Sequence, residues 1–218
     1  MKKLLAIGDS FTYGDELATP ATHAWPYLLA ERIGHEVVNL GVNASGNSKM
    51  LRHLFEQNIN EFDLVILAWS GFDRMEFADD HGIFETWPGA LKKSHRIPHK
   101  ETTFRGELID YMTRYHNDEY LYKQYLVNVI SAQSYLKLHK KKYIMLDAFL
   151  NNQGSMRNRH QELVTQIDTE HFLGWPTETM MEWSGSAPKG QFGHFLELGH
   201  SRVAEKIHQH LIHSRNNL

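Results

Sequence analysis

The stretch LLAIGDSFTYG, residues 4–14, decides how the rest of the chain is interpreted. The apolar run Leu4–Ile7 ends at Gly8, as is typical of a buried parallel strand followed by a turn. Ser10 then lies just beyond the strand, where its hydroxyl can act as a nucleophile and its N–H can bind an oxyanion. The alternative is that Asp9 or Ser10 merely caps a helix, a common use of both residues.

Working outward from this stretch, short apolar runs alternate with segments of helical periodicity. The runs predict further strands at residues 36–40, 64–69 and 143–146. Apolar residues at helical spacing predict helices at residues 25–33 and 47–60, another around 122–130 and a last one around 200–211. Strands that alternate with helices predict an open parallel sheet covered by helices on both faces. In such a sheet, the chemistry belongs at the carboxyl ends of the strands.

The composition excludes several classes of protein. With 218 residues, of which 41% are hydrophobic, the chain has enough apolar material for one globular α/β domain. A formal charge of -3 argues against phosphate neutralisation on a nucleic acid. The absence of cysteine excludes disulfides, thiolate metal sites and a cysteine nucleophile. The apolar runs are too short for an export signal or a membrane span, so we expect a soluble, cytoplasmic chain.

Regular periodicity is lost between Gly71 and Asn117. Irregular segments of this length are usually functional loops, so we expect one domain over residues 1–218 with an insertion or lid at about 74–117. Aromatic residues gather around this stretch, and they could form the walls of a site for a sugar or acyl chain. A small satellite core is the alternative for them. These aromatic residues are Trp69, Phe77, Phe84, Trp87 and Phe104.

Two other segments follow predicted strands or precede a predicted helix. Residues 41–48, GVNASGNS, nearly match a phosphate-binding loop, but Asn47 stands where that motif has its lysine. A better use for Gly46 is close approach of its backbone to a reacting carbonyl, with its N–H as a second oxyanion donor. His194 lies just before the last predicted helix, where it could reach Ser10 at the rim of the sheet.

These segments together resemble the blocks of the SGNH, or GDSL-type, hydrolases. Residues 8–14, GDSFTYG, look like the first block, and residues 45–47, SGN, are similar to the second. Residues 70–73, SGFD, stand in the place of the third block, and the segment that begins at His194 resembles the last. The blocks occur in the order of the family and span nearly the whole chain.

The resemblance implies a flavodoxin-like three-layer α/β/α sandwich with a parallel sheet. It also implies ester hydrolysis through an acyl-enzyme, with Ser10 as the nucleophile and His194 as the general base and then acid. The N–H groups of Ser10 and Gly46 would form the oxyanion hole. Because this route uses only protein groups, we expect no metal and no organic cofactor.

Two positions depart from the pattern of the family. Phe72 replaces an asparagine that would donate to the oxyanion, and the adjacent Ser70 is a candidate to take over that role. Gln191 replaces the aspartate that would hold the histidine, which leaves either a Ser–His dyad or a carboxylate supplied from elsewhere. The candidates for that carboxylate are Glu197, Asp73 and Asp147.

The sequence therefore predicts a serine hydrolase that removes an acyl or acetyl group from a small-molecule or carbohydrate ester. Two alternatives use the same site. One is a weakened module that binds a glycan or acyl ligand, and the other is an acyltransferase. We expect no nucleic-acid or membrane partner, and the sequence does not determine the oligomeric state.

Overall fold

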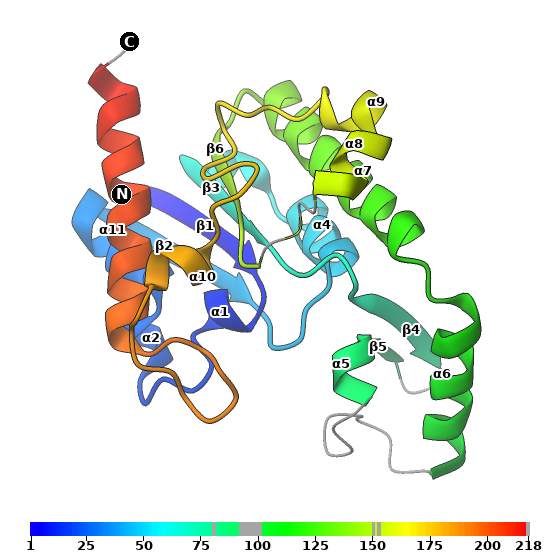
Figure 1. The fold of residues 1–218 in the computed structure, drawn as a ribbon. Coiled ribbons are helices and arrows are strands. Elements are labelled where there is room, and N and C mark those ends of the chain that lie inside the picture. The colour runs from blue at the N-terminus through cyan, green and yellow to red at the C-terminus, as the bar shows by residue number, and fades with distance from the viewer. Residues whose placement is uncertain (80–81, 92–101, 150, 152–153, 217–218) are drawn as a thin grey trace.

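A four-stranded parallel sheet forms the centre of the protein in the computed structural model, which describes residues 1–79, 82–91, 102–149, 151 and 154–216. The strands are β1 (Lys2–Gly8), β2 (His35–Gly41), β3 (Leu64–Trp69) and β6 (Lys142–Asp147), in the order β2-β1-β3-β6 (Figure 1). This is the order of the flavodoxin-like doubly wound folds. The predicted fold class is confirmed.

A further piece of chain extends the sheet beyond β6. The Met145 N–H donates to the carbonyl of His171 at 2.7 Å, and the Leu173 N–H donates to the carbonyl of Met145 at 2.8 Å. The chain around Phe172 thus occupies the place of a fifth strand through a single parallel bridge.

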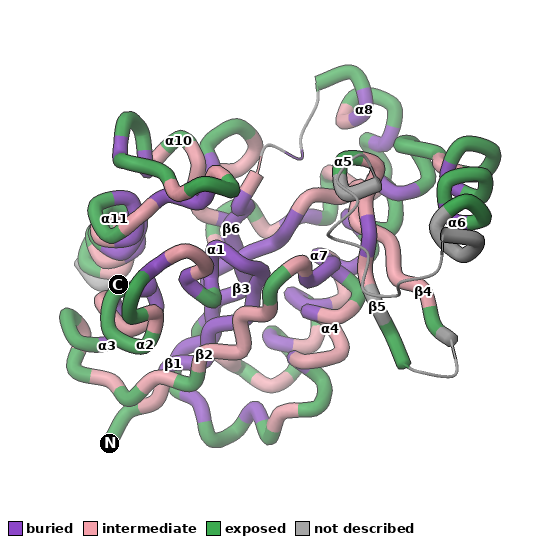
Figure 2. Tube along the Cα trace, turned by 90° about the horizontal axis from the view of Figure 1, so that it is seen from below, coloured by how far each residue is buried: buried purple, intermediate pink, exposed green. Residues whose placement is uncertain are grey.

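Both faces of the sheet are buried, because alternate residues of each strand point to opposite sides. The members of one face are Leu5, Ile7, Val65, Leu67, Trp69, Tyr143 and Met145. The members of the other are Leu4, Ala6, Leu64, Ile66, Ala68, Ile144 and Leu146. Figure 2 shows the buried strands β1, β3 and β6 enclosed by more exposed segments.

Helices cover each face. The first face packs against α4 (Asn47–Glu56) and α7 (Asp118–Leu138), through buried residues such as Leu54 and Leu126. The second packs against α3 (Trp25–Ile33) and α11 (Glu197–Asn216), which also contact one another. The predicted helix at residues 47–60 ends earlier, at Glu56, and a 3₁₀ turn (η1, Ile59–Glu61) follows it.

Shorter helices lie at the strand ends and in the connections. They are α1 (Ser10–Tyr13), α2 (Pro20–His23), α8 (Gly154–Arg159), α9 (Gln161–Val164) and α10 (Met180–Ser184). Among the described residues, no helix combines the length and the apolar character needed to cross a bilayer.

The stretch 71–117 is more regular than the sequence predicts. It contains an antiparallel hairpin of β4 (Met75–Asp79) and β5 (Gly82–Thr86), then α5 (Pro88–Leu91) and α6 (Thr102–Tyr115), set to one side of the sheet (Figure 1). The periodicity is weak because these elements form only a small core of their own, with Leu108 and Met112 as its buried members. Residues 92–101 lie outside the described part of the chain.

Candidate active site

The turn after β1 places Ser10 at the carboxyl edge of the sheet. Asp9 is fully buried and caps α1, since its Oδ1 accepts the Phe11 N–H at 3.0 Å. The capping role therefore falls to Asp9, and Ser10 becomes the first residue of the helix. The Ser10 hydroxyl is left for another partner.

That partner is His194, which lies 184 positions away in the sequence. Its Nε2 is 2.9 Å from the Ser10 Oγ, and both residues are buried. His194 comes from the loop between the short bridge at Lys189 and α11, and its ring packs against Phe11 with the centroids 4.8 Å apart. The first strand end and the last loop of the fold thus meet at one rim.

A carboxylate from Glu16 completes the arrangement. Its Oε2 lies 2.8 Å from His194 Nδ1 and also accepts the His194 N–H at 3.0 Å, while its Oε1 accepts the Phe192 N–H at 2.7 Å. Because an ionised carboxylate can only accept, the imidazole proton belongs on Nδ1. Nε2 is then free to accept the proton of the Ser10 hydroxyl.

The environment of Glu16 favours its charged form. Burial of the side chain opposes ionisation, but the donors from Phe192 and His194 outweigh burial and lower the pKa of Glu16 below its usual value. An ionised Glu16 can hold the imidazole in one tautomer and stabilise the imidazolium, as the acidic member of a catalytic triad does.

The close fit of Glu16 depends on two backbone features. Glu16 has φ of +68°, a left-handed conformation that is uncommon for residues other than glycine. The facing residue is Gly190, and a Cβ there would lie 2.4 Å from the Glu16 carboxyl group. A side chain at position 190 would therefore push the carboxylate away from His194.

Glu16 is not among the residues that the sequence predicted for the site. Gln191, which takes the place of the expected aspartate, is exposed and makes no hydrogen bond to the described residues. The three suggested replacements are wrong, because none of Glu197, Asp73 and Asp147 contacts the His194 imidazole. The only sequence signal was the missing acid at position 191, and no spacing rule connects it to a residue 178 positions from His194.

Two backbone N–H groups, one in the turn after β1 and one in the loop after β2, have no hydrogen-bond partner among the described residues. Neither the Ser10 nor the Gly46 N–H donates a hydrogen bond within the described residues. Gly46 is the N-cap of α4, so its N–H lies at the positive end of that helix. These are the two groups that the sequence suggested for an oxyanion hole.

The third block differs from the sequence expectation. The Ser70 Oγ donates to Asp9 Oδ2 at 2.8 Å, so the suggestion that this hydroxyl replaces the missing asparagine is not supported. Phe72 packs against Tyr122, with ring centroids 5.9 Å apart, and its N–H donates to Asn151 Oδ1 at 2.9 Å. The Phe72 side chain therefore belongs to the hydrophobic core beneath α7.

A cavity of about 500 Å³ opens beside Ser10 and His194. Its walls are mainly apolar, with Asp15 and Arg74 as charged groups. Asp15 Oδ2 lies 3.8 Å from His194 Nε2. The remaining lining residues are Phe11, Asn43, Ala44, Trp87, Phe149, Met181, Phe192 and Gly193.

The aromatic residues singled out in the sequence have different positions. Trp87 lines this cavity, whereas Trp69 is fully buried in the core of the sheet. Phe77 packs edge-on against Tyr111, with ring centroids 5.5 Å apart, in the separate small core of the stretch 71–117. The side chains of Phe84 and Phe104 lie outside the described part of the structure.

A second buried carboxyl group, Asp147, lies at the end of β6. Its Oδ1 accepts from the Tyr125 hydroxyl at 2.8 Å and from the Asn151 amide at 2.9 Å. Burial outweighs these hydrogen bonds and raises the pKa of Asp147 to about 7. The same Asn151 amide donates to the Ser70 carbonyl at 2.9 Å, so this network supports the loop after β3.

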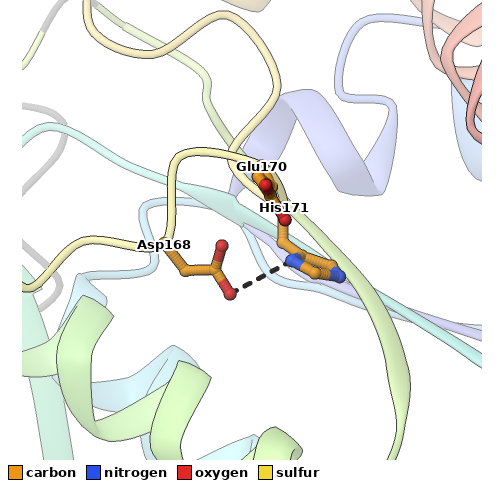
Figure 3. A group of neighbouring side chains, drawn as sticks. All are labelled: Asp168, Glu170 and His171. Carbon is orange, nitrogen blue, oxygen red and sulfur yellow. Dashed lines mark ion pairs between the residues drawn. The ribbon is translucent and has the colours of Figure 1, made fainter.

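Among the described residues, one group brings three metal-ligating side chains together, namely Asp168, Glu170 and His171 (Figure 3). Asp168 Oδ2 forms an ion pair with Lys137 Nζ at 2.6 Å and accepts a hydrogen bond from the Tyr143 hydroxyl at 2.7 Å. It also lies 3.0 Å from His171 Nδ1. Burial opposes ionisation of Asp168, but these neighbours outweigh burial and lower its pKa. Lys137 thus supplies the positive charge that a cation would bring, and the group does not favour a metal.

Several solved structures that are similar to this chain are lipases or esterases by description. The chain is 14% identical to a lipase/acylhydrolase from Enterococcus faecalis, covering 97% of this chain and 95% of that one at a TM-score of 0.52. It is 18% identical to a variant of Axe2, an acetylxylan esterase from Geobacillus stearothermophilus, covering 96% and 94% at a TM-score of 0.53. A family two carbohydrate esterase from Clostridium thermocellum, in complex with cellohexaose, is 12% identical over 100% of this chain and 65% of that one, at a TM-score of 0.56.

These similarities define the class: the protein has the fold of the SGNH, or GDSL-type, hydrolases. At identities this low, the likeness shows the fold alone. The model of a family of unknown function, DUF6071, matches residues 16–210, and the chain belongs to this family. No curated protein matches the sequence significantly.

Proposed function

We propose that this protein is a serine hydrolase that cleaves a carboxylic ester through an acyl-enzyme on Ser10. The observation that carries the proposal is the continuous relay from Ser10 Oγ to His194 Nε2 at 2.9 Å and from His194 Nδ1 to Glu16 at 2.8 Å. A hydroxyl, an imidazole and a carboxylate in this order form the arrangement that activates a serine for acyl transfer.

The relay assigns a role to each group. The Ser10 oxygen attacks the ester carbonyl while His194 Nε2 takes its proton, and Glu16 stabilises the imidazolium that forms. The carbonyl electron pair moves onto the oxygen, where the Ser10 and Gly46 N–H groups donate to it. When the tetrahedral intermediate collapses, His194 returns the proton to the departing alcohol, and water then repeats the sequence to release the acid.

The substrate we propose is an acyl or acetyl ester of a small molecule or a carbohydrate. The cavity is large enough for one such group, and its aromatic walls suit a sugar ring or a short acyl chain. The acetylxylan esterase and the carbohydrate esterase among the structural relatives favour the carbohydrate. We further propose that residues 74–117 are an insertion into a single domain that acts as a lid, since Trp87 from this stretch lines the cavity.

The proposed Glu16 relay also bears on the binding-only alternative. That alternative rested on Gln191 and Phe72, and Glu16 supplies the carboxylate partner of His194 that Gln191 does not provide. An acyltransferase would use the same residues, and product analysis with and without an added alcohol separates transfer from hydrolysis.

The experiment combines active-site labelling with turnover of 4-nitrophenyl acetate. We expect a fluorophosphonate probe to label the wild type at Ser10, and Ser10→Ala to abolish labelling and reduce kcat/KM at least about 10³-fold. Ser134→Ala is the matched control, because Ser134 is an exposed serine on α7. A folded wild-type protein that resists the probe, or equal turnover in the wild type and Ser10→Ala, contradicts the proposal.

A further inference from the structure

Arg74 is a positively charged residue that lines the cavity, and the relay does not use it. It lies in the segment between β3 and β4 (Figure 1), two residues after Phe72. Its side chain is 8% exposed, and it lines the same cavity as Ser10 and His194. An arginine so nearly excluded from water needs compensating partners.

The partners of the Arg74 guanidinium are the residues that immediately precede the two proposed oxyanion donors. One terminal nitrogen donates to the Ser45 carbonyl at 2.8 Å, and the other lies 3.4 Å from Asp9 Oδ2. Ser45 immediately precedes Gly46, and Asp9 immediately precedes Ser10. The backbone at Gly46 lies close to the base of the Arg74 side chain, since a Cβ at Gly46 would lie 3.6 Å from the Arg74 Cβ.

Two aromatic rings lie close to the guanidinium. Its central carbon lies 5.0 Å from the centroid of the Trp87 ring and 5.7 Å from that of Phe149. Guanidinium groups interact favourably with aromatic rings at such distances. Because these rings and the two polar contacts restrain the group, it stays oriented before a substrate arrives, as an electrostatic catalyst requires.

Arg74 also has donors to spare. A guanidinium carries five N–H donors, and the contacts with Ser45 and Asp9 engage two of its nitrogens. No other described residue accepts a hydrogen bond from Arg74. Among the described residues, its remaining donors therefore have no acceptor.

We propose that Arg74 is a catalytic residue that donates to the oxyanion in place of the asparagine replaced by Phe72. This inference rests on the proposed function. As the Ser10 oxygen bonds to the ester carbon, the carbonyl electron pair moves to the carbonyl oxygen, and Arg74 donates to that oxygen together with the Ser10 and Gly46 N–H groups. On collapse, the pair re-forms the carbonyl and the alcohol leaves with the proton from His194.

The test measures kcat and KM for 4-nitrophenyl acetate in Arg74→Met and Arg74→Ala. We expect kcat to fall roughly 10²–10³-fold with KM changed less than about threefold, because the donor acts on charge that develops only in the transition state. Millimolar guanidinium should restore part of the kcat of Arg74→Ala. Arg52→Met is the matched control, since Arg52 pairs with Glu76 at 2.7 Å without lining the cavity.

Each outcome separates this inference from the proposed function. If the wild type hydrolyses the ester and Arg74→Met keeps its kcat, the inference is overturned and the relay stands. A rise in KM with an unchanged kcat also overturns it, because Arg74 would then contribute to substrate binding and not to stabilisation of the transition state. Fluorophosphonate labelling of Ser10 in the variants shows that they are folded. A wild type that neither labels nor hydrolyses overturns both proposals.

Discussion

Among the carboxyl groups near the carboxyl edge of the sheet, Glu16 and Asp147 have surroundings that shift their pKa values in opposite directions. Glu16 faces two backbone N–H groups and an imidazole, and its pKa is lowered. Asp147 is buried beneath α7 with a tyrosine hydroxyl and an amide as donors, and its pKa is raised to about 7. Both accept short hydrogen bonds. The balance between burial, which raises the pKa, and hydrogen-bond donors, which lower it, therefore decides which carboxyl group stays ionised.

The largest expected effect comes from neutralising the charged member of this pair. Glu16→Gln should reduce kcat for 4-nitrophenyl acetate by about 10⁴-fold, because the imidazolium formed on His194 loses its counter-charge and the tautomer is no longer fixed. Steady-state kinetics measures this. The matched change Asp147→Asn should leave kcat within about threefold of the wild type. Equal losses of kcat in the two variants would show that Glu16 and Asp147 do not differ in their importance for catalysis.

The next effect concerns stability and pH at Asp147. Because its folded-state pKa lies above the ordinary value, the folded protein holds this proton more tightly than the unfolded chain does. Its contribution to stability is therefore complete below about pH 4 and is lost as the pH rises towards 7. Asp147→Asn does not titrate, so the wild type should lose roughly 1.4 kcal/mol per pH unit relative to the variant over that range.

Urea unfolding of both proteins at a series of pH values between 4.5 and 8 measures this difference, because the free energy of unfolding falls linearly with the urea concentration. The variant keeps an acceptor for Tyr125 and Asn151, so its core should stay intact. A constant difference between the two proteins across the pH range would show that Asp147 is ionised throughout, and that its surroundings do not differ from those of Glu16.

A smaller effect is expected from the residue that lets Glu16 approach His194. Gly190→Ala should lower kcat about 10- to 100-fold, because the new Cβ would lie 2.4 Å from the Glu16 carboxyl group and one of them must move. Kinetics measures the loss of kcat, and thermal unfolding measures the loss of stability, which overpacking lowers by roughly 1–3 kcal/mol. Gly106→Ala is the control, because a Cβ at Gly106 meets nothing within 4 Å. Full activity in Gly190→Ala would mean that the relay tolerates a displaced Glu16.

The smallest effect should come from Asp15, the other carboxylate near the imidazole. It lies 3.8 Å from His194 Nε2 and its side chain is 34% exposed. Screening by water makes such a contact weak, so Asp15→Asn should change kcat/KM by no more than about fivefold. A loss as large as that of Glu16→Gln would transfer the role of the triad acid to Asp15.

Much of the fold could be predicted from the sequence, because strands buried on both faces leave continuous apolar runs. The predicted strand at residues 64–69 and the predicted helix at residues 25–33 agree with β3 and α3. The hairpin β4–β5 and the helix α6 could not be predicted, since their small core requires few apolar residues and leaves no long periodic stripe.

The site residues could be predicted only where the order of strands and helices brings them to the carboxyl edge of the sheet. Ser10 and His194 stand at positions that the topology alone brings to one rim. Glu16 follows no such rule: it enters the site through a left-handed turn and a facing glycine, which are tertiary features. The place of Arg74 in the site could not be predicted either, because its neighbours Trp87 and Phe149 come from separate segments of the chain.

The most direct test of the relay is to trap the covalent intermediate. Wild-type protein mixed rapidly with 4-nitrophenyl acetate and quenched in acid should carry one acetyl group, found by peptide mass spectrometry on the peptide that contains Ser10. The Glu16→Gln variant should accumulate the same group far more slowly. Ester hydrolysis without an acetyl group on Ser10, or with the group on another residue, would contradict the account.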